Sequence, residues 1–362
     1  MNEKNTRSYP LDFLKLLATI AIVFHHFQQI NEVFYPNHIN FFGDWFYWGY
    51  LVEFFFILSG YFMHKYITKI QEEMSLSLWF AKRAKRLLPL VAVSALVFEV
   101  LSLVYYIIFD KHWWGIRLTL WGTVLTSLGI QEGWVFVNPA VNSPTWYISV
   151  LMLCYIIFYL LTRLAKKINC SPLYLYIGMV LLGCAIKTYD IALPFLTGQA
   201  ARGYYSFFFG LLLAHFIQCC GIPKRIAAVS TAIVAALTAL FVFFPSAAEG
   251  ELAYLLTFMM FPAIIILFET TFVKRIFSHS FWGVCGAVSF NIYIWHVPLF
   301  PLLAICLKLL NISIEISRIR YMYIFALIAI AVGIISHYFI EKPLNKFIDK
   351  QIDFFKSREK IQ

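Results

Sequence analysis

Residues 321–340 read YMYIFALIAIAVGIISHYFI and hold no Asp, Glu, Lys or Arg. A helix needs about 20 mostly apolar residues to cross the hydrocarbon core of a bilayer, and this stretch supplies them. Similar stretches recur along the chain, so the sequence predicts an all-α, polytopic membrane protein with about ten transmembrane helices. The predicted spans are residues 11–30, 46–66, 87–109, 145–163, 171–187, 203–218, 226–244, 252–272, 286–307 and 321–340. Residues 115–130 are apolar but shorter, and we expect a re-entrant or interfacial helix there.

The composition agrees with this class. Apolar residues make up 61% of the chain and charged residues 13%, whereas soluble domains have about 45–50% and about 25%. The net charge of +10 could suggest a nucleic-acid partner. The basic residues lie instead in short clusters between apolar runs, which is the pattern that sets membrane topology. We therefore expect contact with membrane lipids and no nucleic acid.

The positions of Lys and Arg predict the orientation. With the N-terminus in the cytoplasm, 21 of the 29 basic residues lie in cytoplasmic segments, 7 lie in external segments, and Lys15 lies within the first span. Such an excess marks the cytoplasmic side. We expect a multi-pass protein of the plasma (inner) membrane with both termini in the cytoplasm. We divide the chain into a transmembrane domain, residues 1–345, and a basic cytoplasmic tail, residues 346–362.

The seven cysteines lie inside predicted spans or near predicted cytoplasmic loops. None lies in a segment that we place on the external side, so we expect no disulfide framework. The sequence has no CxxC pair and no Cys/His spacing typical of zinc sites, and we predict no structural metal.

The first span carries four ionisable side chains, Asp12, Lys15, His25 and His26. Eleven residues separate Lys15 from His26, which is about three helical turns, so both lie on one face about 16 Å apart along the axis. His25 points about 100° away from that face. Asp12 lies one turn from Lys15 and can pair with it. An interfacial ion pair and a functional site are both open for Asp12 and Lys15, whereas a histidine beyond the bilayer midplane favours function.

The second span begins its apolar run with a carboxylate, Glu53, flanked by aromatic residues. A carboxylate there needs a partner or a shifted proton affinity. Ser59 and Gly60 follow, and such small residues allow a helix or a ligand to approach the backbone closely. Taken alone, they are better explained by a helix crossing.

Residues 79–89 read WFAKRAKRLLP and carry four cations in five positions, Lys82, Arg83, Lys85 and Arg86. They could hold anionic lipid headgroups. Alternatively, Arg83 and Arg86 share a helix face at a spacing of three and could clamp a phosphate. Both interpretations remain open on the residues alone.

These segments together resemble the acyltransferase-3 family of multi-span membrane acyltransferases, from Leu11 to about Pro343. Five motifs carry the resemblance in order: LDFLK followed by His26, EFFFILSGY at 53–61, KRxxRLxP at 82–89, SFxIYIWHxP at 289–298, and EKP at 341–343. The resemblance implies an enzyme that moves acyl groups, often acetyl from acetyl-CoA, onto cell-envelope sugars and related acceptors.

The family pattern of Arg, ten residues and His falls on Lys15 and His26 in this chain. Lysine keeps the charge but loses the bidentate fork of arginine. The family acid before the Phe run corresponds to Glu53, and its Arg-x-x-Arg corresponds to Arg83 and Arg86. Many members carry a Glu after the Trp-x-x-Ser of the fourth span, and here Val150 and Leu151 follow Ser149 instead.

The resemblance implies a role for each candidate residue. His26 is the general base or a transient acyl carrier, and Glu53 orients or protonates it. Acyl-CoA, a co-substrate and not a permanently bound cofactor, is held by Arg83 and Arg86, helped by Lys82 and Lys85. We add Lys15 and Ser59 to the acyl-CoA site. Residues with an orienting role are Asp12, Tyr147 and His296. The implied acceptor is a polysaccharide or a lipid-linked sugar.

A proton-coupled transporter is the main alternative. Its relay would consist of the intramembrane groups Asp12, Lys15, His26, Glu53 and His296. The sequence shows no repeated halves and no matched pair of interrupted helices, which such transporters commonly have. A non-catalytic membrane scaffold is a third possibility, but it needs no buried ionisable groups.

Overall fold

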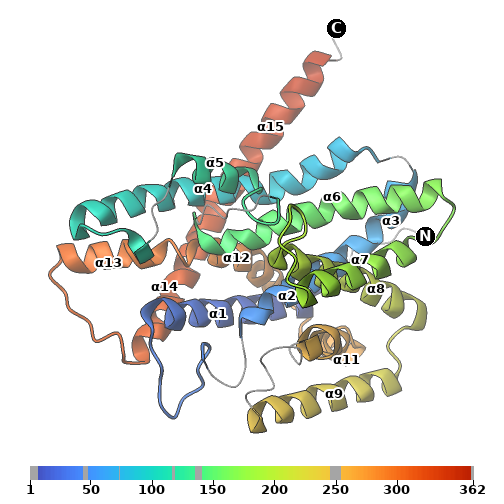
Figure 1. Cartoon of the computed structure of the whole chain (residues 1–362), viewed down its shortest axis with the longest axis horizontal. Helices are drawn as coiled ribbons and strands as arrows, with labels where there is room; N and C mark the ends of the chain where they lie inside the picture. Colours follow the sequence, from blue (N-terminus) through green and yellow to red (C-terminus); the bar gives the residue numbers. More distant parts are fainter. Residues whose placement is uncertain are drawn as a thin grey trace.

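The computed structural model describes residues 7–43, 48–72, 74–115, 119–134, 141–244 and 254–359, with side chains described as far as Lys350. Within these ranges the backbone forms helices α1 to α15 and no β-strand, which confirms the all-α class (Figure 1). The α-helices are α1 (Tyr9–Asn31), α2 (Leu51–Met63), α3 (Ile67–Glu72), α4 (Leu76–Phe109), α5 (Leu120–Leu128), α6 (Trp146–Lys167), α7 (Pro172–Thr188), α8 (Gly198–Cys220), α9 (Lys224–Phe243), α10 (Phe261–Phe268), α11 (Thr271–Ile276), α12 (Phe281–Trp295), α13 (Leu299–Leu309), α14 (Arg320–Ser336) and α15 (Lys342–Glu359). Short 3-10 turns lie at Trp48–Tyr50, His64–Tyr66, Trp113–Gly115 and Ser143–Thr145, and π-helical turns at Leu256–Met260 and His337–Glu341.

The predicted number of membrane spans is not confirmed. Six helices of the described chain are long and apolar enough to cross a bilayer, namely α1, α4, α6 with its preceding turn, α8, α9 and the helix from Arg320 to Lys350. The pair α12 and α13, which bends by 63°, would be a seventh. The count of about ten is not confirmed, because α2 has 13 residues, α7 has 17, and the apolar helix Leu256–Phe268 is also short. These fall below the length of about 20 residues that a span requires.

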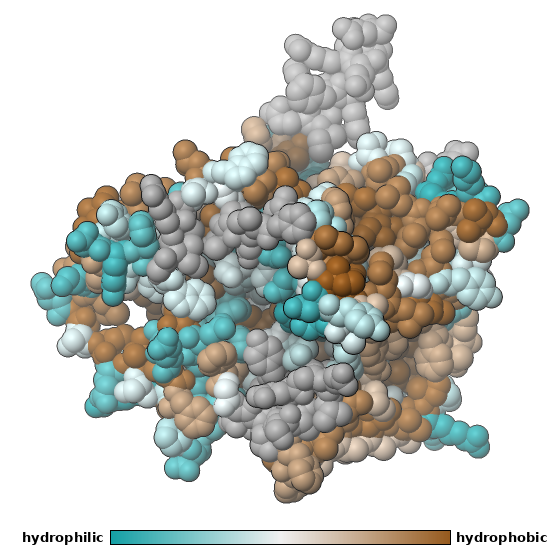
Figure 2. All heavy atoms as spheres, viewed as in Figure 1, coloured by the Kyte–Doolittle hydropathy of each residue, from teal (hydrophilic) through white to brown (hydrophobic). Residues whose placement is uncertain are grey.

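The apolar stretch at residues 115–130 contains α5, a helix of nine residues that packs against α4. A helix of this length cannot cross a bilayer, in agreement with the prediction of a non-spanning helix. Its side chains Leu120 and Trp121 are exposed on the surface of the molecule. Figure 2 shows apolar residues over much of the visible surface, as expected for a protein that faces lipid.

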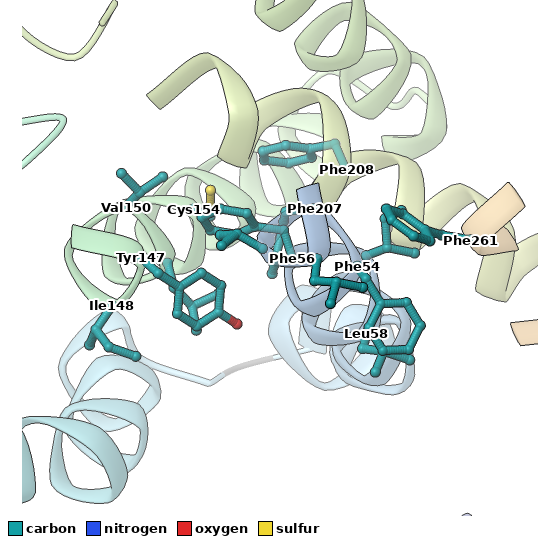
Figure 3. Close-up of a cluster of buried hydrophobic side chains, with 14 of the residues drawn as sticks. Phe54, Phe56, Leu58, Tyr147, Ile148, Val150, Cys154, Phe207, Phe208 and Phe261 are labelled. Carbon is teal, nitrogen blue, oxygen red and sulfur yellow. The ribbon is translucent and has the colours of Figure 1, made fainter. Parts of the chain in front are cut away.

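The centre of the bundle is built where α2, α6 and α8 meet. Figure 3 shows side chains from these helices in contact there, among them Phe56, Cys154 and Phe207, and all three are fully buried. Two glycines let α2 and α8 approach backbone to backbone. A Cβ atom on Gly60 would lie 1.9 Å from the carbonyl oxygen of Phe207, and one on Gly210 would lie 2.1 Å from that of Ile57. The helix-crossing interpretation of Gly60 is therefore confirmed.

A polar network ties α12 to the end of α14. The indole Nε1 of Trp295 donates to Ser336 Oγ at 2.6 Å, and Ser336 Oγ donates to Asn291 Oδ1 at 2.8 Å. Asn291 Nδ2 in turn donates to Glu341 Oε2 at 2.7 Å, and His337 Nδ1 lies 2.6 Å from the same oxygen. The network connects the IWH and EKP motifs, and it fixes the part of α12 that leads into the bend before α13.

The last helix, α15, projects away from the bundle in Figure 1. The helix from Arg320 runs to Lys350 as one span, so its backbone has no break at residue 345. An ion pair from Lys85 on α4 to Asp349 links the described part of α15 to the bundle.

Candidate active site

Two cavities border the face of α1 that carries Lys15 and His26, and we call this row of residues the stripe of α1. Lys15 and Thr19 line the first, of about 390 Å³, and Ile22 and His26 line the second, of about 210 Å³. We call the first the cationic cavity, and its lining includes Lys15, Ser59, Tyr66, Lys82, Arg83, Arg86, Tyr147 and Tyr293. We call the second the histidine cavity, and its lining includes His25, His26, Gln29, Trp146, Gln199, Arg202 and Tyr293. The predicted alignment of Lys15 and His26 on one face of α1 is therefore confirmed. The start of this stripe lines one cavity and its end lines the other.

Aromatic rings hold one of the cations of the cationic cavity in place. The guanidinium carbon of Arg83 lies 3.5 Å from the centroid of the Trp79 ring and 4.4 Å from that of Tyr66. Such cation–π contacts are favourable and do not use the hydrogen-bonding edge of the guanidinium for a carboxylate. Arg83 is thereby fixed while its charge stays available to a ligand.

Three cations that line the cationic cavity have no carboxylate partner among the described residues. No Asp or Glu lines it within the described chain, and none of the described carboxylates lies within ion-pair distance of Lys82, Arg83 or Arg86. Lys85 differs from its three neighbours because it does not line the cavity and pairs with Asp349. The structure thus brings together three of the four predicted cations, and their excess positive charge suits an anionic ligand.

Lys15 both pairs with a carboxylate and faces the cationic cavity. Its Nζ donates to Asp12 Oδ1 at 2.9 Å and lies 4.5 Å from the centroid of the Phe62 ring. Arg7 forms a second ion pair with Asp12. The predicted pairing of Asp12 with Lys15 is confirmed, and Asp12 positions the lysine at the cavity wall.

Ser59 and Tyr147 meet in the same wall. Their hydroxyl oxygens lie 3.1 Å apart, and the Tyr147 hydroxyl donates to the carbonyl oxygen of Phe55 at 3.3 Å. Because that carbonyl can only accept, the Ser59 hydroxyl is the donor toward Tyr147. Tyr147 thus orients Ser59.

His26, which lines the histidine cavity, forms a hydrogen-bonded pair with His296. Nδ1 of His26 lies 2.9 Å from Nε2 of His296, and Nδ1 of His296 lies 2.7 Å from the carbonyl oxygen of Tyr293. A carbonyl oxygen only accepts, so Nδ1 of a neutral His296 carries the proton and its Nε2 accepts from Nδ1 of His26. This network assigns the tautomer of His26 and leaves its Nε2 with a free lone pair. The arrangement can take a proton from a ligand.

Glu53 does not contact His26. Its two oxygens accept from Arg202, at 2.5 Å from Nε and 2.7 Å from Nη2, and Oε1 also accepts from the Tyr205 hydroxyl at 3.1 Å. Its side chain is completely buried, whereas that of Arg202 remains 17% exposed and borders the histidine cavity. The structure therefore places Glu53 behind Arg202, and the side chain that orients His26 is His296.

His25 has a different environment from its neighbour. Its Nδ1 lies 2.6 Å from the carbonyl oxygen of Phe41, in the segment after α1, and the residue is buried. Nδ1 therefore donates to a backbone acceptor. His25 anchors that segment, and His26 faces its paired histidine.

Two important residues of the site were not singled out from the sequence. Arg202 was counted only as an external basic residue, although a cation at the start of an apolar helix is itself a signal for a buried partner. Tyr293 was noted only as part of a motif, yet it lines both cavities.

Comparison with known protein families gives a match over most of the chain. A family model described as an acyltransferase domain, that of the acyltransferase-3 family, matches residues 9–338. No curated protein and no solved structure matches the chain. The matched residues include both cavities and all the helices from α1 to α14.

Proposed function

Because the chain belongs to the acyltransferase-3 family, we propose that it is a membrane O-acyltransferase that moves an acetyl group from acetyl-CoA to a hydroxyl of a cell-surface polysaccharide or lipid-linked sugar. The observation that carries this proposal is that the two cavities present different chemical groups to a ligand. One presents Lys82, Arg83 and Arg86, which have no carboxylate partner among the described residues, and the other presents a histidine whose Nε2 takes no part in the histidine pair.

The cationic cavity suits the phosphates of CoA. Arg83 and Arg86 border it from α4 with Lys82, and Lys15 borders it from α1. Guanidinium groups bind phosphate oxygens through charge-assisted hydrogen bonds. Arg83 and Arg86 hold the phosphates in this proposal, while Lys15 and Ser59 line the path of the pantetheine arm toward the histidine cavity.

His26 acts as the general base. Its Nε2 takes the proton of the acceptor hydroxyl while the hydroxyl oxygen attacks the carbonyl carbon of the thioester. The C–S bond then breaks, the new C–O bond remains, and His26 returns the proton to the CoA thiolate. His296 accepts from Nδ1 of His26 throughout and so keeps the ring oriented. Arg202 borders the same cavity, where its guanidinium is held by Glu53 and forms part of the wall.

The orientation follows from the basic residues. With both termini in the cytoplasm of a plasma-membrane protein, the Arg83–Arg86 end of the cationic cavity faces cytoplasmic acetyl-CoA, and the acceptor enters the histidine cavity from outside. The acyl group then crosses the membrane without the CoA. A topology reporter fused at Gln362 should be active only in its cytoplasmic form.

The transporter relay has less support from the contacts. Asp12 bonds to Lys15, Glu53 to Arg202 and His26 to His296. Each of these bonds joins one local pair, whereas a proton relay requires a continuous chain of hydrogen bonds between the groups.

Purified protein in lipid nanodiscs tests the proposal. We expect free CoA thiol to appear when acetyl-CoA is added, and to appear faster with a sugar acceptor that becomes acetylated. The variant His26→Ala should release neither CoA nor product. If the intact protein consumes no acetyl-CoA with any of a panel of acceptors, the proposed donor and acceptor are wrong.

A further inference from the structure

Tyr293 on α12 separates the two cavities. Of the described side chains that line them, it alone borders both. Its hydroxyl donates to the carbonyl oxygen of Pro144 at 2.5 Å, and Pro144 lines the histidine cavity just before α6. The buried ring therefore bridges the space between α12 and the start of α6.

Other rings close the gap on both sides of Tyr293. The ring centroids of Tyr147 and Phe55, which line the cationic cavity, lie 5.9 Å and 6.4 Å from that of Tyr293. The ring of His296, which bonds to His26, lies 5.8 Å away. Aromatic rings at these separations are in packing contact. A ligand group in the cationic cavity thus meets an aromatic wall before it reaches the histidines.

We infer that the Tyr293 ring is the partition between the two cavities and sets the largest acyl group that can reach His26. This inference rests on the proposed function, since it requires the donor to be held by Arg83 and Arg86. A thioester held there must extend past Tyr293, because His26 lines only the histidine cavity. An acetyl group needs a small displacement of the ring from Pro144, and a longer chain needs a larger one.

The Tyr293 ring can move without breaking the hydrogen bond that orients His296, because that bond uses the backbone of Tyr293. Nδ1 of His296 donates to the carbonyl oxygen of Tyr293 and not to its side chain. Replacing the side chain therefore leaves that acceptor in place. The variants Tyr293→Phe and Tyr293→Ala separate the partition from the orientation of the base.

Acyl-chain selectivity is the first test. CoA release and acyl transfer are measured with acetyl-, butyryl- and hexanoyl-CoA. Tyr293→Ala should raise the hexanoyl-to-acetyl ratio of kcat/KM by about 10-fold or more, the scale on which apolar pockets discriminate chain length. Tyr293→Phe, which loses only the bond to Pro144, should raise it less. An unchanged ratio in Tyr293→Ala overturns the inference.

Tyr204→Phe is the matched control. Its hydroxyl donates to the carbonyl oxygen of Phe195 at 2.5 Å, the same kind of bond as in Tyr293, but Tyr204 lines neither cavity. The ratio should not change in this variant. A change equal to that of Tyr293→Phe would show that any lost tyrosine bond has this effect, and would overturn the inference.

Thiol labelling tests the partition without any enzymatic readout. Thr19→Cys places a thiol in the cationic cavity, and a membrane-impermeant methanethiosulfonate is added to sealed vesicles of either orientation, with labelling at position 19 measured by peptide mass spectrometry. With Tyr293 intact, labelling should occur only from the face that carries Lys82 and Arg86. With Tyr293→Ala, it should also occur from the opposite face. Equal labelling from both faces with Tyr293 intact overturns the partition. If no variant transfers any acyl group, the proposed function fails, and this labelling alone decides on the partition.

Discussion

The cationic cavity and the histidine cavity lie along the same face of α1, but they differ in whether their arginines are paired with a carboxylate. In the first, Arg83 and Arg86 lack a carboxylate partner within the described chain. In the second, the guanidinium of Arg202 is paired with both oxygens of the buried Glu53. Charges that the fold leaves unbalanced are available to a ligand, whereas charges paired inside the protein fix the shape of a wall. We therefore expect mutations in the two cavities to have different consequences.

The largest effect is expected from the catalytic base in the histidine cavity. A general base contributes about 10²–10⁴-fold to the rate, so His26→Ala should lower kcat for acyl transfer by about that factor. The protein should still accumulate in the membrane, because His26 is only partly buried. Acyl transfer is measured with purified variants at equal amounts of folded protein.

His25→Ala is the control, since the two histidines are adjacent and lie at nearly the same depth along the axis of α1. His25 bonds to the backbone of Phe41. Its loss should lower stability, because the carbonyl oxygen of Phe41 loses its donor, while most activity per folded molecule remains. If His25→Ala is the inactive variant and His26→Ala is active, the assignment of the stripe is wrong by one residue.

The next effect concerns the paired charge behind the histidine cavity. Glu53→Ala leaves the guanidinium of Arg202 without its carboxylate, and removing one partner of a buried pair typically costs about 3–5 kcal/mol. We expect a marked drop in the midpoint of thermal unfolding in detergent, together with lost activity. The double variant Glu53→Gln with Arg202→Gln removes both charges and should regain part of the stability. A double variant less stable than Glu53→Ala would contradict this role.

The sequence predicted where helices lie more accurately than how many of them cross the membrane. A helix lies in every predicted span, because apolar runs of this length are stable only as helices in a bilayer. The count of about ten is not confirmed, because hydropathy does not show where a helix ends. The predicted span 46–66 holds only 13 residues of α2, and its residues 46 and 47 lie outside the described chain. Span 286–307 is divided at a bend near Pro298, and proline favours such a break.

The candidate site was predictable only along single helices. The stripe from Lys15 to His26 follows from 100° per residue, and Arg83 and Arg86 share the cationic cavity for the same reason. Helical periodicity could not predict contacts between segments that are far apart in the sequence. Glu53 and Arg202 are 149 residues apart, and His26 and His296 are 270 residues apart. Their pairing depends on how α1, α2, α8 and α12 pack.

A third effect is expected in the cationic cavity. If Arg83 and Arg86 bind phosphates, replacing both with Ala should raise KM for acetyl-CoA, since each charge-assisted contact is worth about 1.5–3 kcal/mol. The KM for the acceptor should change much less, because the acceptor binds in the other cavity. Steady-state kinetics with each substrate varied separately measure both constants. An unchanged KM for acetyl-CoA would favour the interpretation that these cations hold lipid headgroups.

The smallest effect is expected from Lys85, which belongs to the same basic cluster but lies outside the cavity. Its ammonium pairs with Asp349 on α15, and both side chains are partly exposed. Exposed ion pairs contribute about 0–1 kcal/mol, so Lys85→Ala should shift the unfolding midpoint little. The KM of Lys85→Ala for acetyl-CoA should stay at the level of the unmodified protein, whereas the KM of Arg86→Ala should rise. Each variant loses one positive charge, and the two positions are adjacent in the sequence. A rise of equal size in Lys85→Ala would mean that the general charge of the segment attracts CoA. In that case the unpaired cations of the cavity would not be the binding groups, and the contrast between paired and unpaired charges would not explain where the donor binds.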